Sequence, residues 1–412
     1  MQSEFQDPIT RSNHILRHQI YGIALSKASL DRTTNRLFGE DRNLRIIPDY
    51  IRKLRGINMG IRPDGKQNNI VDILNKEFGE DMNIDVVIGN PPYQEESGGR
   101  NATPLYNRFM DMGLKLSDIS LWITPSRWFS GGIGLDNFRH EILSSNRITL
   151  IKNYKQAQKI FKGVDIAGGV CITSICRHSD TIKFIDGETD NSIDVDSNFI
   201  KEKEMLLDRC EAYSIVEKTK NTKNLDKIAL PLNTFGLNAN FQGSIIPDKY
   251  NNIEVLGRYD SRTYINKDEL EKGSDIVDKY KVIVGKASSE HAGVPSSDGR
   301  YNVFSNNIRV LKPNQICTFT YIVVGNTCSE DKANALYKYI KTKFTRFLVL
   351  VTLTSMNISA RNFTFVPMQD FTSNSDIDWS QSIADIDKQL YKKYALSKEE
   401  IEYIEQTIKP ME

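Results

Sequence analysis

The feature that most constrains the fold is a short apolar segment, residues 84–88, that leads directly into Asn-Pro-Pro-Tyr at residues 90–93. The segment is apolar apart from Asp85, which predicts a strand buried on both faces except near its start. The two prolines lack a backbone N–H and stiffen the chain, so the strand ends in a rigid loop. The carboxyl end of a strand is also where open α/β sheets bind their ligands.

Segments of helical and strand periodicity alternate around this strand. Apolar residues recur at helical spacing in residues 105–116 and 136–143, and Ser26 is a plausible N-cap for an earlier helix. That helix is predicted over 26–37 after a strand at 19–25, a short amphipathic segment over 70–78, and further strands at 119–124, 148–154, 167–176 and 181–185. This alternation predicts a parallel sheet, and the cluster of strands at its end predicts an antiparallel edge.

The second half of the chain has a different texture. Residues 186–198 are polar and acidic, which predicts a linker or exposed loop, and residues 202–218 have helical spacing. Short β-like runs separated by Gly, Asn and Ser then predict a second, more irregular α+β domain; these runs are 280–284, 307–311 and 319–324. Helices are predicted over 333–347 and near the C-terminus, where Ser397 and Glu400 form a capping-box pattern.

Composition narrows the partners and the compartment. The 412 residues can form two or three domains, and 54 basic against 53 acidic residues exclude a histone-like polycation, so any DNA contact must come from local patches. The five cysteines show no metal-ligand spacing with the five histidines, which predicts free thiols, no metal site and a reducing compartment. No signal peptide and no apolar stretch of membrane-spanning length are found, which predicts a cytoplasmic protein with no membrane partner.

The tetrapeptide combines groups that suit one chemical task. The Asn90 side chain and the Pro91 backbone each offer a carbonyl acceptor, Pro92 stiffens the turn, and Tyr93 adds a flat aromatic face. Two acceptors beside an aromatic plane can hold the amino group of a planar amine while its ring is stacked. The alternative is a proline-rich turn in which Tyr93 is only a half-buried wedge, and the position at the end of a strand disfavours it.

In this strand context, Asn90, Pro91, Pro92 and Tyr93 resemble the catalytic loop of amino-methyltransferases, which use S-adenosylmethionine as methyl donor. The wider resemblance is to adenine-specific (N6) DNA methyltransferases of restriction–modification systems. It implies that Asn90 and the Pro91 carbonyl orient the adenine amine, and that Tyr93 stacks on the flipped-out base. The fold implied is a Rossmann-like methyltransferase sheet followed by a smaller α+β target-recognition domain. The implied domains are a methyltransferase core (1–190), a linker and helix (191–224), the recognition domain (225–370) and a C-terminal helical segment (371–412).

The resemblance also implies cofactor contacts. Residues 21–26 resemble the strand whose end meets the cofactor's ribose, at Ala24 and Leu25, although many relatives have an acid there. Asp72 lies 18 residues before Asn90, about where the family's third-strand acid meets the cofactor's adenine, but it could equally be an ordinary exposed carboxylate. Asn90 is also expected to lie against the cofactor.

DNA contacts are expected from an aromatic residue and from basic residues. Residues 122–128 resemble the strand and loop beside the catalytic loop, and Trp128 either stacks on a base or packs in the core. Residues 160–170 resemble a later hairpin. Residues 338–347 resemble a recurrent basic segment of the recognition domain, with a solvated helix face as the alternative. The expected DNA contacts are Lys338, Lys341 and Lys343 with phosphates, Arg346 with a phosphate or base edge, and more weakly Lys281 and Lys286.

One family element is missing from the sequence. The glycine loop Asp-Pro-x-x-Gly-x-Gly, which holds the methionine part of the cofactor, does not occur before Ile20 or after the catalytic loop. We therefore expect an incomplete methyltransferase core whose glycine loop comes from an upstream segment or a separate chain, or a decayed copy.

Three functions stay open at this point. The first is a DNA methyltransferase, acting on double-stranded DNA alongside a cognate restriction endonuclease. The second is methyl transfer to a protein glutamine or an RNA base, since the loop suits any planar amide or amine. The third is an inactive DNA-binding remnant. No endonuclease motif is visible in the chain itself.

Overall fold

The computed structural model describes residues 84–94 and 103–411, except 133, 165, 167, 221, 289–294, 305–307 and 354–356, together with scattered positions before residue 48. The contacts divide the chain into two compact units, Met1–Leu121 and Trp122–Glu412. The division falls inside strand β4 (Ile119–Pro125). The four-part domain division expected from the sequence stays a prediction.

The first unit contains strand β3 (Val86–Gly89) and helix α5 (Tyr106–Leu116), both close to their predicted positions. Ser117 is the C-cap of α5, and its hydroxyl donates a 2.6 Å hydrogen bond to the Asp85 carbonyl and accepts one from the Ile119 N–H at 3.0 Å. The starts of β3 and β4 are therefore adjacent, so these strands run in the same direction. Two short parallel strands, β1 (Gly22–Ile23) and β2 (Ile46–Ile47), are also described.

The burial of β3 differs from the prediction. Val86 and Ile88 are 48% and 75% exposed, so one face of the strand is open. Alternate residues of a strand point to opposite faces, and apolar composition alone does not show that both faces are covered. Of the other elements predicted in this unit, the segment 70–78 lies outside the described residues, and the helix 26–37 is described only at Arg32 and Asn35.

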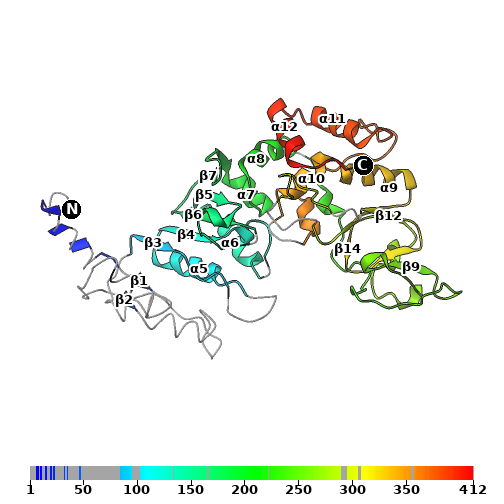
Figure 1. The fold of residues 1–412 in the computed structure, drawn as a ribbon, viewed down its shortest axis with the longest axis horizontal. Coiled ribbons are helices and arrows are strands. Elements are labelled where there is room, and N and C mark those ends of the chain that lie inside the picture. Colours follow the sequence, from blue (N-terminus) through cyan, green and yellow to red (C-terminus); the bar gives the residue numbers. More distant parts are fainter. Residues whose placement is uncertain are drawn as a thin grey trace. The chain divides into compact units, whose positions relative to one another are not determined.

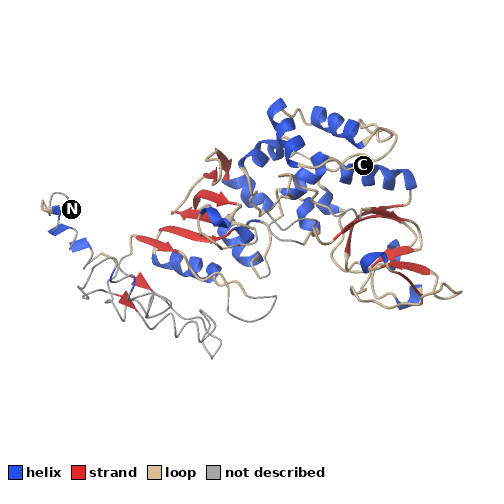
Figure 2. Ribbon diagram, in the orientation of Figure 1, coloured by secondary structure: helices blue, strands red, loops and turns tan. Residues whose placement is uncertain are grey.

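The second unit contains sheet strands in the order β4-β6-β5-β7-β8 (Figures 1 and 2). Strand β5 pairs antiparallel with β6 and parallel with β7, and β8 pairs antiparallel with β7. The Ser126 N–H donates to the Gly169 carbonyl at 3.1 Å, so β4 also ends beside the start of β6. The bounds are β5 (Ile148–Tyr154), β6 (Val170–Ile175), β7 (Thr181–Asp186) and β8 (Ser192–Asp196). This mixed sheet, with helices such as α6 (Asp136–Ser144), confirms the predicted α/β class.

The prediction of a linker or exposed loop at 186–198 was wrong. This segment contains β8 and the start of helix α7 (Ser197–Lys203), whose N-cap Asp196 accepts a hydrogen bond from the Asn198 N–H. In β8, Ile193 and Val195 alternate with exposed polar and acidic residues, so one face of this edge strand is partly buried. The acidic residues made the segment look like an exposed loop in the sequence. The single helix predicted over 202–218 is interrupted at Glu204, which has φ 50°, and resumes as α8 (Cys210–Glu217).

Two three-stranded sheets form the next part of this unit, in the orders β10-β9-β13 and β12-β11-β14. A shared core of buried aliphatic residues joins them and includes Val255, Ile283, Ile316 and Val323. Their bounds are β9 (Ile253–Leu256), β10 (Arg262–Ile265), β11 (Tyr280–Gly285), β12 (Arg309–Leu311), β13 (Gln315–Cys317) and β14 (Tyr321–Thr327). The irregular α+β region expected here is confirmed.

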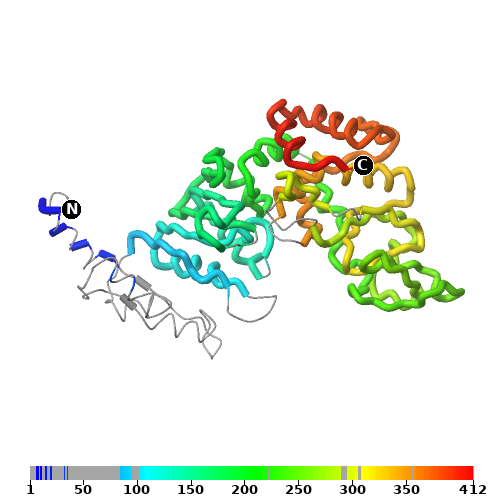
Figure 3. Tube along the Cα trace, viewed as in Figure 1, coloured from blue at the N-terminus to red at the C-terminus, as the bar shows by residue number. Residues whose placement is uncertain are grey.

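The predicted helix 333–347 is two helices, α9 (Glu330–Lys341) and α10 (Lys343–Leu350). Thr342 separates them in an extended conformation (φ −60°, ψ 149°) and caps α10 through its side chain. Helix α10 contacts α9 and both C-terminal helices, α11 (Ile383–Lys393) and α12 (Lys398–Thr407), which Figure 3 shows in orange and red. The predicted capping box of Ser397 and Glu400 is confirmed. Among the described residues, no helix combines the length and apolarity needed to cross a bilayer.

Candidate functional site

The Asn-Pro-Pro-Tyr loop leaves the carboxyl end of β3 with its amide exposed. Asn90 is exposed, Pro91 is buried, and Pro92 and Tyr93 are half-buried. The Tyr93 hydroxyl donates to Asn90 Oδ1 at 3.1 Å, and the Leu105 N–H donates to the Tyr93 carbonyl at 3.1 Å. The backbone of the loop is therefore tied to the start of α5, and its two polar side chains are tied to each other.

Tyr93 also contacts the first residue of α5. Its ring lies 6.5 Å from that of Tyr106 at 86°, and Tyr106 is only 2% exposed, so the contact comes from a fixed core residue. An edge contact of this kind covers at most one face of the Tyr93 ring. The exposed Asn90 amide oxygen has a second lone pair beyond the one that accepts from Tyr93. The loop thus presents an oriented carbonyl acceptor next to a positioned aromatic ring.

The hydrogen bond between Tyr93 and Asn90 was not anticipated from the sequence. The expected role of Tyr93 was stacking, although a donor three residues after an acceptor across two prolines could have suggested this bond. The predicted cofactor contacts Ala24, Leu25 and Asp72 lie outside the described residues and stay predictions. Asn90 is the member of that predicted set that the structure describes.

Trp128 is a core residue and not an exposed stacking partner. It is fully buried in the short 3-10 helix η1 (Ser126–Phe129), with ring centroids 5.0 Å from Phe129 and 5.9 Å from Phe138. The packing alternative was therefore right, and its DNA-contact assignment is corrected, because a buried indole cannot reach a base.

Gly169 in the 160–170 segment serves packing. Gly169 has φ 80°, and a Cβ there would lie 2.3 Å from the Tyr154 carbonyl oxygen. The backbone of this turn approaches the end of β5 too closely for a side chain, which explains the glycine without any ligand.

Two predicted phosphate contacts of the expected recognition domain, Lys281 and Lys286, lie against protein groups. Lys281 is fully buried, and its Nζ donates to the carbonyls of Ile276 (3.2 Å) and Val277 (2.8 Å). Burial removes the ammonium group from water and lowers the pKa of Lys281 to about 8. The two backbone carbonyls replace part of the lost hydration. Lys286 Nζ lies 3.5 Å from the centre of the Phe319 ring, and partial burial lowers the pKa of Lys286. Lys281 is therefore corrected to a structural role.

The basic segment 338–346 stabilises the C-terminal helices. Lys338 Nζ donates to the carbonyls of residues 379, 380 and 381 at 2.9–3.1 Å, and Lys343 forms an ion pair with Glu405. Arg346 is fully buried and donates to the carbonyls of residues 302, 341 and 409. Lys341 lies over the Tyr337 ring at 5.0 Å. Protein groups already contact these four cations, which disfavours their expected role in DNA binding, and their assignment to DNA stays a prediction.

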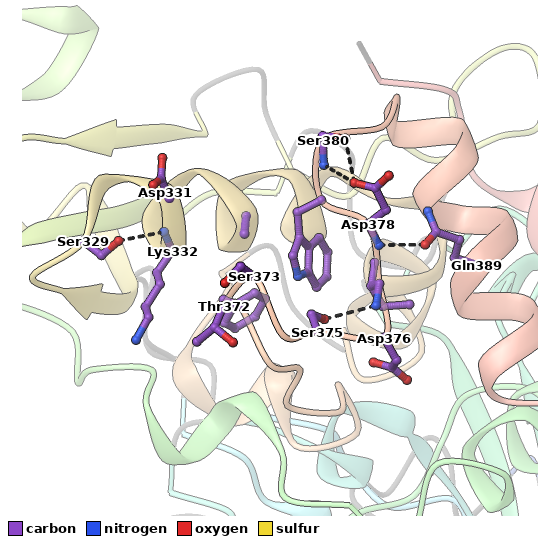
Figure 4. Close-up of a pocket in the computed structure, with 14 residues that line it drawn as sticks. Ser329, Asp331, Lys332, Thr372, Ser373, Ser375, Asp376, Asp378, Ser380 and Gln389 are labelled. Carbon is purple, nitrogen blue, oxygen red and sulfur yellow. Dashed lines mark hydrogen bonds between the residues drawn. The ribbon is translucent and has the colours of Figure 1, made fainter.

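A hollow of about 740 Å³ lies between the start of α9 and the loop 371–380 (Figure 4). Its walls carry three carboxylates, Asp331, Asp376 and Asp378, against one lysine, Lys332. Asp376 pairs with Lys393, and Asp378 accepts from Ser380. The acidic lining is unsuited to nucleic-acid phosphates, and two of its three carboxylates, Asp376 and Asp378, already have partners within the chain.

Comparison with known protein families gives a match to the N-terminal part of the chain. Residues 18–161 match the Eco57I restriction-modification methylase family. This match contains the Asn-Pro-Pro-Tyr loop and confirms the resemblance to restriction–modification methyltransferases over that part of the chain. Among curated proteins, none matches the chain.

Solved structures of restriction–modification enzymes show distant similarity. The type I methyltransferase subunit from Streptococcus thermophilus is 14% identical over 45% of this chain and 46% of its own, with a TM-score of 0.26. The type ISP enzyme LlaGI, bound to a DNA substrate mimic, is 8% identical over 87% and 47%, with a TM-score of 0.43. The type IIL enzyme MmeI, bound to DNA, is 10% identical over 92% and 57%, with a TM-score of 0.39. The chain thus spans about half the length of each, and no residue role is transferred from them.

Proposed function

We propose, from the premise that residues 18–161 match the restriction-modification methylases, that this chain carries the methyl-transfer loop of a DNA methyltransferase that modifies adenine N6. The observation that carries the proposal is the exposed Asn90 amide at the carboxyl end of β3, hydrogen-bonded to the neighbouring Tyr93. The basic and acidic residues balance, so DNA affinity would depend on local contacts.

Each residue of the loop has a distinct task in this proposal. Asn90 Oδ1 and the Pro91 carbonyl would accept the two hydrogens of the adenine amine, which turns its lone pair toward the methyl donor. Pro91 and Pro92 keep these acceptors in place because their backbone φ is restricted. Tyr93 would stack on the base, which has to leave the duplex to reach the loop. Catalysis is then mainly positioning, worth many orders of magnitude when reacting atoms are aligned.

The methyl donor in this proposal is S-adenosylmethionine, whose sulfonium supplies an already activated methyl group. Asn90 is the described residue that would lie against it, and its exposure at the strand end fits that position. Ala24, Leu25 and Asp72 remain proposed contacts. A glycine loop from a further segment or partner chain would complete the cofactor site.

The direct test is transfer of a labelled methyl group from S-adenosylmethionine to duplex DNA, followed by nucleoside analysis. Wild-type chain, with any glycine-loop partner added, should yield N6-methyladenine, and Asn90→Ala should reduce transfer by at least about a hundredfold, since an oriented acceptor is lost. DNA affinity should stay near wild type because the amide is one contact among many. Methylated protein glutamine or RNA with unmethylated DNA would contradict the proposal, as would full activity of Asn90→Ala.

A further inference from the structure

The β9–β10 hairpin carries an exposed tip on a rigid base. Leu256 at the end of β9 pairs with Arg262 at the start of β10, so residues 257–261 form the turn between them. Beneath the turn, Ile253, Val255 and Ile265 are at most 3% exposed and belong to the core shared by the two small sheets. A surface loop on such a base can hold its side chains in fixed positions.

The backbone of this tip is strained. Tyr259 (φ 56°, ψ 34°) and Asp260 (φ 60°) both adopt the left-handed conformation, which non-glycine residues avoid. Contacts outside the turn maintain it: the Asp260 carboxylate accepts from Arg309 at 2.6 Å and from the Tyr321 hydroxyl at 3.4 Å. Within the turn, the Gly257 N–H donates to the Ser261 carbonyl at 2.8 Å. Such strain persists only where surrounding structure holds it, and it often marks a functional site.

The strained turn displays an aromatic ring and a cation together. Tyr259 is 86% exposed, and the Arg258 guanidinium lies 4.6 Å from the centre of its ring. In the part of the chain that the structure describes, Arg258 forms no ion pair, whereas the nearby acids are neutralised: Asp260 by Arg309 and Glu254 by Arg262. The tip therefore carries an unneutralised positive charge beside a flat apolar surface.

This pair differs from the cations expected to bind DNA. Lys338, Lys343 and Arg346 have partners within the protein, so they cannot bind phosphates without breaking those contacts. Arg258 and Tyr259 could bind DNA without breaking comparable contacts. Arginine binds phosphate oxygens and base edges, and an exposed aromatic ring stacks on bases.

We propose that Arg258 and Tyr259 form a direct contact of this chain with double-stranded DNA. The inference rests on the proposed function, because DNA is the substrate that function implies. A protein surface is the other class of partner that an exposed aromatic–cation pair could bind, and the experiment below separates the two.

The decisive variant is Tyr259→Gly. Glycine adopts φ 56° without strain, so the midpoint of thermal unfolding should be unchanged or higher than that of the wild type. The variant lacks the ring, so its affinity for a labelled duplex library of randomised sequence should fall by about tenfold. Tyr259→Phe, which keeps the ring, should retain most of the affinity. A variant that folds better and binds DNA less well separates the role of the ring from that of the fold.

A matched control lies at the other end of the same two strands. Lys249 and Tyr250 form a second aromatic–cation pair, with Nζ 5.8 Å from the ring centre and Tyr250 67% exposed. The double variant Lys249→Ala/Tyr250→Ala should leave DNA affinity within about twofold of the wild type, whereas Arg258→Ala/Tyr259→Ala should weaken it by more than about tenfold. Equal losses in both would mean a nonspecific surface effect and would overturn the proposal.

The outcomes also distinguish this inference from the proposed function. Wild-type DNA affinity in Tyr259→Gly would overturn the inference and favour a protein partner for the tip, whatever the methyl-transfer result. Loss of affinity in that variant, with no methyl transfer by the wild-type protein, would support the tip as a DNA contact and contradict the proposed function alone.

Discussion

At the scale of single residues, the hydroxyl of Tyr93 has a role that stacking does not include. It donates to the Asn90 amide oxygen at 3.1 Å, so it helps set the orientation of the acceptor proposed to hold the amine. Stacking and orientation can be separated by substitution, because phenylalanine keeps the ring and loses only the donor.

We expect Tyr93→Phe to reduce kcat/KM for methyl transfer severalfold, in line with the loss of a hydrogen bond of about 1 kcal/mol. Tyr93→Ala should reduce it by about tenfold more, because the stacking face is lost as well. Steady-state transfer of labelled methyl groups measures both. Equal activity of Tyr93→Ala and the wild type would eliminate the stacking role, and equal losses in the two variants would mean that the hydroxyl, not the ring, matters.

Gly169 makes a second prediction at this scale. A Cβ there would lie 2.3 Å from the Tyr154 carbonyl oxygen, whereas at Gly163, with a similar φ of 75°, no atom lies within 4 Å. Gly163→Ala should therefore cost only the backbone strain, about 1 kcal/mol, and Gly169→Ala about 2 kcal/mol or more beyond that. Urea unfolding of both variants gives the difference. If the two variants lose the same stability, the close approach has no energetic weight.

At the scale of elements, sequence periodicity predicted what is locally encoded. The helix 105–116 and the strands at 148–154 and 181–185 were predicted close to their observed ends, because their apolar residues repeat with one period. Strand β8 was missed because its exposed positions are acidic, and the break between α9 and α10 because a single threonine, Thr342, makes it. Neither signal stands out from the surrounding sequence.

The break between α9 and α10 is stabilised from another element. Asp387 on α11 accepts hydrogen bonds from the backbone N–H groups of Lys343 and Phe344, both at 2.9 Å, at the start of α10. Although these bonds favour the carboxylate, burial is the larger effect and raises the pKa of Asp387 to about 6 from a usual value of 3.8.

This raised pKa predicts a pH dependence of stability. The folded state binds the Asp387 proton more tightly than the unfolded chain does. Proton binding at Asp387 therefore adds to the free energy of unfolding in full below about pH 4, and this stabilisation is lost as the pH rises through about 6. Two pKa units correspond to about 3 kcal/mol as an upper estimate. The unfolding free energy of the wild type minus that of Asp387→Asn should therefore be larger at pH 4.5 than at pH 7. Denaturant unfolding at both pH values tests this, and a difference that grows with pH would contradict it.

At the scale of the whole molecule, the sequence predicted the class of fold and a loop that follows a strand better than it predicted which basic residues are exposed. The loop can be recognised in the sequence because its proposed chemistry rests on four adjacent residues, and their position after a strand follows from the local pattern. The environment of a basic side chain depends on contacts that the local pattern does not show. Lys281 donates to the carbonyl of Val277 in the preceding turn, and Arg346 donates to carbonyls of residues 44 and 63 positions away. The sequence therefore shows how many basic residues the chain has, but it does not show which of them face solvent.

This difference sets how DNA affinity should depend on salt. Each phosphate contact releases condensed counterions, so the logarithm of affinity falls with the logarithm of salt concentration by about 0.9 per contact. Lys343 pairs with Glu405, and its replacement by alanine should lower the unfolding free energy modestly and leave that slope unchanged. Arg258→Ala should flatten the slope by about 1 if Arg258 binds a phosphate. Binding titrations of the wild type, Lys343→Ala and Arg258→Ala over a range of salt concentrations measure the slopes. A flatter slope for Lys343→Ala, with Arg258→Ala like the wild type, would return the DNA-binding surface to the basic helices.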